Sequence, residues 1–256
     1  MSAPGVVLDE RGRLRLATAI GETPETLMTI EQLRRGLCRA TVSGSPDRPE
    51  AAIVQPDAFP TDATAIGNDP DALWSLLSGM DGWQCVDTAH DIAPALAARI
   101  TAATRRACTL HEEIFFLLDR PVEAWTHTNV RRLTAGDLPL MAAATAGLGM
   151  GDWRFGSAAA LITEGFAAGA VIGGQLVAVA FTAARGARLA DVGIVTREEW
   201  RHQGLSTAAA ALVCADIQAA GQIPVWGTSV DNIASRRVAA KLGFREVSRR
   251  VYVCRD

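Results

Sequence analysis

Short apolar runs alternate with polar, glycine- and proline-containing stretches along the chain, and those of the C-terminal half are closely spaced. Runs with the length of a strand occupy 130–133, 167–172, 175–183 and 189–196. Gly173-Gly174 predicts a two-residue hairpin turn between the second and third runs. A longer alanine-rich run at 205–220 predicts a helix, and 223–228 again predicts a strand. The pattern indicates an antiparallel meander followed by a strand, a helix and another strand.

The N-terminal half also alternates predicted strands and helices. Residues 6–17 predict an irregular or weakly helical lead-in, and 43–50, rich in Pro, Gly and Asp, predict a loop. Thr23-Pro24 predicts a helix start, with Thr23 as N-cap and Pro24 in the first helical position. Asn68-Asp69-Pro70 predicts a second helix start by the same logic. The remaining runs predict strands at 51–55 and 83–86 and helices at 72–78 and 93–105.

A chain of 256 residues has room for one large or two modest domains. We place a boundary near 125, which predicts an N-terminal α/β domain over 1–125 and a second domain over 126–256. Only the second half contains a turn with the composition of a phosphate site. The predicted class is α/β, or more closely α+β.

That turn is Arg201-His202-Gln203-Gly204-Leu205-Ser206, between the predicted strand and the alanine-rich helix. The first N–H groups of a helix have no helical partners and carry partial positive charge, so a glycine-bearing turn there suits an anion. Gly204 lets the backbone approach a phosphate. Ser206 and Thr207 add hydroxyls, and Arg201 adds charge. The alternative is an ordinary turn that needs its glycine for geometry.

A second signature follows the next strand: Asp231-Asn232-Ile233-Ala234-Ser235, a helical stretch, then Lys241-Leu242-Gly243-Phe244. Together the two segments resemble the GNAT superfamily of acyl-CoA-dependent N-acyltransferases. Arg201 and Gly204 match its (Q/R)xxGx(G/A) pyrophosphate motif, with Ser206 in place of the last small residue. Asn232, Ser235 and the Lys-Leu-Gly-Phe stretch are similar to its NxxAxxxYxKLGF-type element. The resemblance covers roughly 129–253, about half the chain, and the preceding half loosely resembles a degenerate GNAT-like domain.

The resemblance implies a GNAT fold, a mixed and mostly antiparallel sheet flanked by helices, with acetyl-CoA as cosubstrate and no metal. The pantetheine arm would pair with the backbone of Ile194, Val195 and Thr196. The amides from Gln203 to Ser206 would hold the pyrophosphate. The implied coenzyme-binding set is Ile194, Val195, Thr196, Arg201, His202, Gln203, Gly204, Leu205, Ser206, Thr207, Asn232 and Ser235. Asn232 is also a good N-cap.

The catalytic groups are less determined. The family's usual tyrosine acid falls at Ala239, and no spacing argument brings Tyr252, the only tyrosine, to the sulfur. Asp191 and Glu164 are the proposed base candidates, while Glu198 and Glu199 have the character of surface carboxylates. Because side chains alternate along a strand, Asp191 is expected on the face of the sheet opposite to that of Val192, unless a β-bulge reverses the alternation. Residues 147–152, rich in glycine, form a candidate substrate loop.

Composition narrows the function class. The formal net charge of -3 gives no reason to expect a nucleic-acid partner, and no apolar run has the length of a membrane span. No signal-peptide pattern is present, so a cytoplasmic protein is expected. The five cysteines are scattered and include no CxxC pair, which argues against a disulfide framework. His90, His111 and His127 are too dispersed for a metal site. The expected partner is a small-molecule or protein amine, with a homodimer as a candidate assembly. The alternative function is a non-catalytic acyl-CoA sensor.

Overall fold

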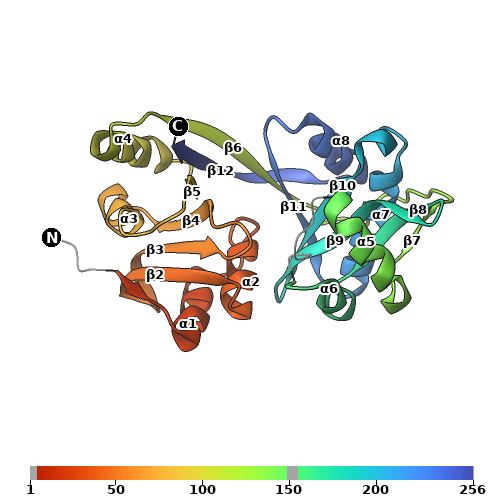
Figure 1. The fold of residues 1–256 in the computed structure, drawn as a ribbon, viewed down its shortest axis with the longest axis horizontal. Coiled ribbons are helices and arrows are strands. Elements are labelled where there is room, and N and C mark those ends of the chain that lie inside the picture. The colour runs from red at the N-terminus through yellow and green to blue at the C-terminus, as the bar shows by residue number, and fades with distance from the viewer. Residues whose placement is uncertain (1–4, 149–154, 256) are drawn as a thin grey trace. The chain divides into compact units, whose positions relative to one another are not determined.

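The computed structural model describes residues 5–148 and 155–255. They form two compact units (Figure 1). The first unit comprises Met1–Ile114 and Ser248–Asp256, and the second comprises Phe115–Val247. Strands β6 (Cys108–Leu117) and β12 (Arg245–Arg255) begin in one unit and end in the other. The C-terminal strand therefore returns to the first unit, a connection that a single boundary near 125 does not include.

The sheet of the first unit has the strand order β1-β2-β3-β4-β5-β12. Its own strands are β1 (Val6–Val7), β2 (Cys38–Ser45), β3 (Arg48–Pro56), β4 (Asp62–Gly67) and β5 (Cys85–Ala89). Its helices are α1 (Glu10–Ile20), α2 (Leu27–Arg35), α3 (Pro70–Leu77) and α4 (Ala93–Thr104). Alternate residues of β3 enter opposite cores: Ile53 packs with α3 and α4, and Val54 packs with α1 and α2. Helices thus cover both faces of the sheet.

Two N-terminal predictions were wrong, and a third was right only in part. Residues 43–50 are not a loop, because β2 and β3 form a hairpin that turns within 46–47, after a register shift at Ser43/Gly44. Thr23 does not cap a helix: Thr23–Thr26 is a turn held by hydroxyl hydrogen bonds, and α2 begins at Leu27. The segment 6–17 contains an edge strand and most of α1, which Asp9 caps through Gly12 N. Local polar side chains set these boundaries, and apolar periodicity alone does not reveal them.

Strand β4 was missed by the sequence reading, and it is the strand that gives the first unit a parallel pair. It pairs with β5 over Asp62–Thr64, where Thr64 lies opposite Asp87. With helix α3 between them, β4 and β5 form a strand-helix-strand unit. Asp69 caps α3 by accepting a hydrogen bond from Asp71 N, and Pro70 occupies the first helical position, as predicted.

The sheet of the second unit has the order β6-β11-β10-β9-β8-β7. Its strands include β7 (Val130–Arg132), β8 (Ala167–Ile172), β9 (Gln175–Arg185), β10 (Leu189–Thr196) and β11 (Ile223–Ser229). Its helices are α5 (Leu138–Leu148), α6 (Ala158–Glu164), α7 (Leu205–Ala219) and α8 (Ile233–Leu242). The meander, the Gly173-Gly174 hairpin and the strand-helix-strand unit all follow the apolar pattern. Gly147 lies within α5, and residues 149–152 of the candidate substrate loop lie outside the described residues.

Small side chains let α7 pack closely on its sheet. Its alanines, with Val213, Cys214 and Ile217, contact Ala180, Ala190 and Trp226 in one core. Trp226 meets the Phe244 ring edge-on at 5.4 Å between centroids. The alanine-rich composition of α7 is therefore the composition of a helix that lies close against strands.

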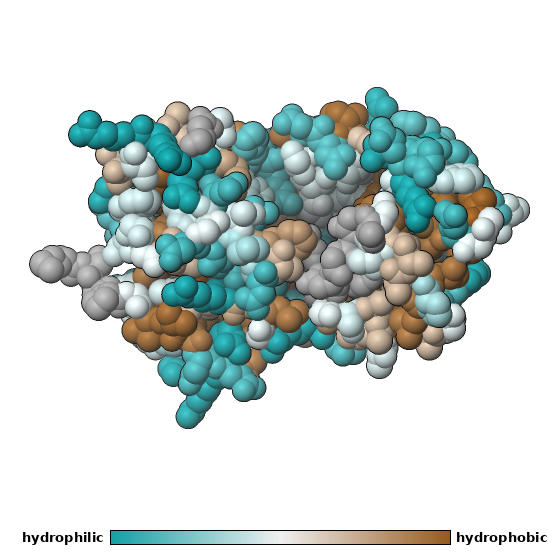
Figure 2. Space-filling view, in the orientation of Figure 1, coloured by the Kyte–Doolittle hydropathy of each residue, from teal (hydrophilic) through white to brown (hydrophobic). Residues whose placement is uncertain are grey.

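The first unit contains a disulfide between Cys85 on β5 and Cys254 on β12, which face each other across the strand pair. The expectation from scattered cysteines was wrong here, because cysteines 169 positions apart in sequence become neighbours when β12 returns. Within 5–148 and 155–255, no helix has the length and apolarity needed to cross a membrane. Figure 2 shows a face on which hydrophobic residues form small patches among hydrophilic ones.

Candidate functional site

Strands β10 and β11 separate partway along their length, and a pocket lies at this opening. Their parallel pairing covers only Leu189–Asp191 of β10, and the remainder of β10 pairs with β9 alone. The edge of β10 toward β11 is therefore unpaired from Val192 onward. A cavity of about 780 Å³ is lined by the end of β10, the start of α7 and one face of α8. That volume suits a ligand of cofactor size.

The turn before α7 brings backbone N–H groups to this pocket. His202 and Gly204 have positive φ angles of 65° and 78°, and no side chain caps the helix. The left-handed backbone is easy for glycine and unusual for other residues, and such outliers concentrate at functional sites. An uncapped helix start beside a cavity leaves its N–H groups and dipole available to an anion.

The charge of the lining has one sign. Arg201, Arg237 and Lys241 line the pocket together with His202, and none of the described lining residues is acidic. The Lys241 ammonium lies 5.6 Å from the centre of the Trp125 ring, and within the described residues none of the three cations has an ion pair. Uncompensated cations around an uncapped helix start favour a multiply charged anionic ligand.

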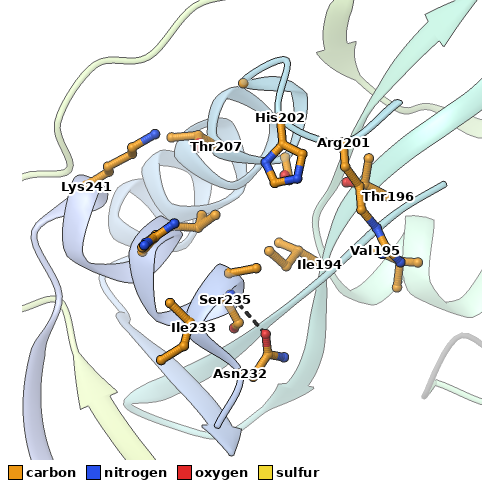
Figure 3. Close-up of a pocket in the computed structure, with 15 residues that line it drawn as sticks. Ile194, Val195, Thr196, Arg201, His202, Thr207, Asn232, Ile233, Ser235 and Lys241 are labelled. Atoms are coloured by element: carbon orange, nitrogen blue, oxygen red, sulfur yellow. Dashed lines mark hydrogen bonds between the residues drawn. The ribbon is translucent and has the colours of Figure 1, made fainter. Parts of the chain in front are cut away.

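The other end of the pocket is neutral and hydrogen-bonded. Figure 3 shows Lys241, Thr207 and His202 toward one end, and Ser235 and Asn232 toward the other. Asn232 caps α8 by accepting a hydrogen bond from Ser235 N at 3.1 Å. The buried Trp226 indole donates to Ser235 Oγ at 2.9 Å. The pocket is therefore graded from cationic to neutral along its length.

The structure brings most of the predicted coenzyme residues together. Ten of them line this pocket: Ile194, Val195, Thr196, Arg201, His202, Gly204, Ser206, Thr207, Asn232 and Ser235. The side chain of Leu205 is buried in a small core with Val177 and Ala178, and Gln203 is exposed outside the pocket lining. Their backbone amides still belong to the turn, so their predicted roles rest on the main chain alone.

Five lining residues were not in the predicted coenzyme-binding set: Ile233, Ala234, Arg237, Val238 and Lys241. Four of them lie at positions 234, 237, 238 and 241, the spacing of one helix face. Once Asn232 is taken as the start of a helix beside the ligand, that periodicity points directly to Arg237 and Lys241. The signal was present in the sequence, but it required a known helix start.

Neither predicted base candidate lines the pocket. Asp191 lies on β10 where it still pairs with β11, and Glu164 ends α6, where its backbone carbonyl accepts a hydrogen bond from Arg185. A register shift does occur at Asp191/Val192, but the extra residue, Ala183, is on β9. The alternation along β10 is therefore unbroken, with Ala190 and Val192 in the core against α7 and Asp191 on the opposite face. Their catalytic roles stay predictions.

Two other reactive side chains, Tyr252 and Cys214, do not line the pocket. Tyr252 lies in the segment that belongs to the first unit, where burial raises the pKa of its hydroxyl. Burial raises the pKa of Cys214 to about 12, so this thiol stays protonated inside the α7 core. Across the described parts of the chain, no cluster of His, Cys, Asp or Glu is arranged to hold a metal.

Residues 149–252 match the sequence model of the GNAT acetyltransferase family. The C-terminal region is a GNAT acetyltransferase domain. Its pocket lies where the two GNAT-like segments meet, between the Arg201–Ser206 turn and the helix that follows Asn232. A comparison with curated proteins found no match.

Solved structures extend the likeness over both units. A GCN5-related N-acetyltransferase-like protein from Streptococcus suis superposes with a TM-score of 0.65 at 16% identity, covering 96% of this chain and 99% of that one. A Drosophila protein gives 0.69 at 13% identity, with 99% and 98% covered. A tandem GNAT protein from the clavulanic acid biosynthesis pathway gives 0.59 at 17% identity, with 97% of each chain covered. These likenesses establish the GNAT fold, a mixed sheet flanked by helices.

Proposed function

We propose that this chain is an acyl-CoA-dependent N-acyltransferase that moves an acetyl group from acetyl-CoA to a primary amine of a small molecule or protein. The observation that carries the proposal is the graded pocket of the GNAT domain. An uncapped helix start and three cations in a lining without acidic residues suit a pyrophosphate and a further phosphate. The unpaired edge of β10 offers backbone groups to an extended amide-containing arm.

Acyl transfer by direct attack needs a neutral amine, a fixed line of approach and stabilisation of the developing oxyanion. Binding both reactants at one opening supplies much of this effect by proximity. A base removes the proton that the attacking nitrogen loses, and Asp191 and Glu164 remain the carboxylates proposed for it. The acceptor amine is identified here only by its class.

Calorimetric titration with acetyl-CoA tests the binding half of the proposal, and we expect a saturable signal. Release of free CoA over a panel of amines tests catalysis. Gly204→Glu places bulk and negative charge at the helix start, so it should abolish binding. Absence of binding by the intact protein, or normal binding by Gly204→Glu, would contradict the assignment.

A second function, a non-catalytic acyl-CoA sensor, is favoured by two observations. Ala239 occupies the position of the usual tyrosine and is fully buried, and neither proposed carboxylate lines the pocket. The two functions differ in turnover. Tight acetyl-CoA binding with no CoA release over a broad amine panel would identify a sensor.

A further inference from the structure

We infer that the Ser235 hydroxyl donates a hydrogen bond to the thioester sulfur and stabilises the departing CoA thiolate. This inference deepens the proposed function and rests on it. It starts from the hydrogen bond between Trp226 and Ser235. Because an indole N–H is only a donor, Ser235 Oγ must be the acceptor of that 2.9 Å bond. Its own hydroxyl proton must therefore point elsewhere.

Within the described residues, the Ser235 hydroxyl has no acceptor for its proton, although its backbone N–H is used by Asn232. Ser235 lines the pocket, so the ligand is the natural acceptor. Trp226 is 1% exposed and packed in the main core of the second unit, which holds its N–H in place. A fixed donor on one side orients the hydroxyl and polarises its O–H bond toward the cavity.

The gradation of the pocket decides which part of the ligand Ser235 meets. Phosphates belong at the end that contains Lys241, His202 and the start of α7 (Figure 3), by charge and by the helix dipole. Ser235 and Asn232 lie toward the opposite, neutral end (Figure 3). A linear molecule with phosphates at one end and a thioester at the other therefore places its sulfur near Ser235.

Position on α8 supports the same assignment. Ser235 and Ala239 are four residues apart and so lie on one helix face. Ala239 is fully buried and has no polar group, so the hydroxyl one turn earlier is the donor on that face. Thr196, Ser206 and Thr207 also line the pocket, but they extend from β10 and from the phosphate end of α7.

The chemical step balances without proton transfer from serine. The amine lone pair forms the N–C bond, and the C–S bond breaks with its electron pair left on sulfur. The nitrogen loses a proton to a base, and water returns one to the thiolate, so the products are an amide and CoA thiol. Ser235 keeps its proton throughout and donates a hydrogen bond that strengthens as negative charge develops on sulfur.

The pKa of the CoA thiol bound to the protein tests the inference without knowledge of the acceptor. Thiolate absorbance of bound CoA, followed against pH, gives this pKa directly. Ser235→Ala should raise the bound-thiol pKa by roughly one unit, the effect of a hydrogen bond to a charged group. Ser235→Thr keeps a hydroxyl and should restore most of the shift. Trp226→Phe should give an intermediate value, because the hydroxyl stays but loses its orienting donor.

Ser206→Ala is the matched control. It removes a hydroxyl at the phosphate end, so it should weaken CoA binding and leave the bound-thiol pKa unchanged. With any amine that is turned over, Ser235→Ala should lower kcat about tenfold with little change in KM for acetyl-CoA. A bound-thiol pKa equal in wild type and Ser235→Ala would overturn the inference while the proposed function stands. Absence of CoA binding by the wild type would instead overturn the proposed function.

Discussion

Each unit has a parallel strand pair with a helix between its members, but only one of the two pairs is accessible to an anion. In the second unit, β10 and β11 separate after Asp191/Val225, and the space between them is a pocket. In the first unit, β4 and β5 separate after Thr64/Asp87. There the Arg250 guanidinium bridges the strands, donating to the Asp87 carboxylate at 2.7 and 2.9 Å and to the Ala65 carbonyl at 3.0 Å. A side chain of β12 satisfies the groups that a ligand would otherwise contact.

The N-termini of helices α3 and α7 also differ in whether their backbone N–H groups are open to a ligand. Helix α3 is capped by the Asp69 carboxylate and begins with Pro70, which has no N–H. Helix α7 begins after Gly204 with no side-chain cap. One helix start therefore already holds an anion belonging to the protein, whereas the other leaves its N–H groups for a ligand. The comparison teaches that a parallel strand pair with an intervening helix is not by itself an open anion site: a capping carboxylate and one arginine occupy in the first unit the positions that stay open in the second.

The largest expected effect comes from breaking the Arg250 bridge. Arg250→Met leaves the buried Asp87 carboxylate without its partner, so the free energy of unfolding at pH 7 should fall by about 3–5 kcal/mol. Urea denaturation measures it. The double variant Asp87→Asn/Arg250→Met removes both charges and should recover much of the loss. A loss below about 1 kcal/mol for Arg250→Met would show that the bridge does not hold the strands.

The same pair predicts a pH dependence. Burial raises the pKa of Asp87 to about 6, because desolvation outweighs the attraction of Arg250 and nearby Glu25 opposes ionisation further. The native state then binds more protons than the unfolded state between about pH 4 and 6, so the contribution of Asp87 to stability falls as pH rises through that window. The stability difference between wild type and Asp87→Asn should decrease by up to about 3 kcal/mol from pH 4 to pH 7. A difference that grows with pH would contradict the raised pKa.

The sequence predicted the second unit far better than the first, for identifiable reasons. Residues 167–196 carry regular apolar runs and a Gly-Gly turn, so pattern and structure agree. Strand β4 contains the small residues Ala63 and Ala65, whose burial depends on α3 and on β12 rather than on local periodicity. The Cys85–Cys254 and Arg250–Asp87 contacts require β12 to return across the whole chain.

The candidate site also has some parts that the sequence predicts and others that only the structure reveals. The Arg201–Ser206 turn is encoded locally by a glycine and a helix start, so the sequence pointed to it as a lining of the pocket, and its role as an anion site stays a prediction. Arg237 and Lys241 needed the phase of α8, which depends on where Asn232 caps it. The hydrogen bond from Trp226 to Ser235 joins a strand residue to a helix residue. It depends on tertiary packing, so no sequence pattern predicts it.

Converting the α7 start into the α3 type sharpens the comparison. Gly204→Asp places a capping carboxylate where the α3 start has one, and an ideal Cβ at this position meets no atom within 4 Å. Affinity for acetyl-CoA should fall roughly 100-fold through repulsion of the phosphate and occupation of the N–H groups. Gly204→Asn is the matched control, since it has the same shape and the same left-handed backbone without the charge. Equal losses in both variants would assign the effect to backbone strain and not to the anion site.

The smallest expected effects concern the cationic face of α8. Arg237→Gln and Lys241→Gln should each weaken acetyl-CoA binding roughly two- to fivefold, the range of exposed ion pairs, and the loss should shrink as salt is raised. Arg236→Gln is the control on the same helix, because that guanidinium donates to the Val230 carbonyl and lies outside the pocket lining. Calorimetry at two salt concentrations measures all three. If Arg236→Gln weakened binding as much as its neighbour, net charge and not the pocket face would account for the affinity. A selective, salt-dependent loss at 237 and 241 would place the phosphates on that face of α8.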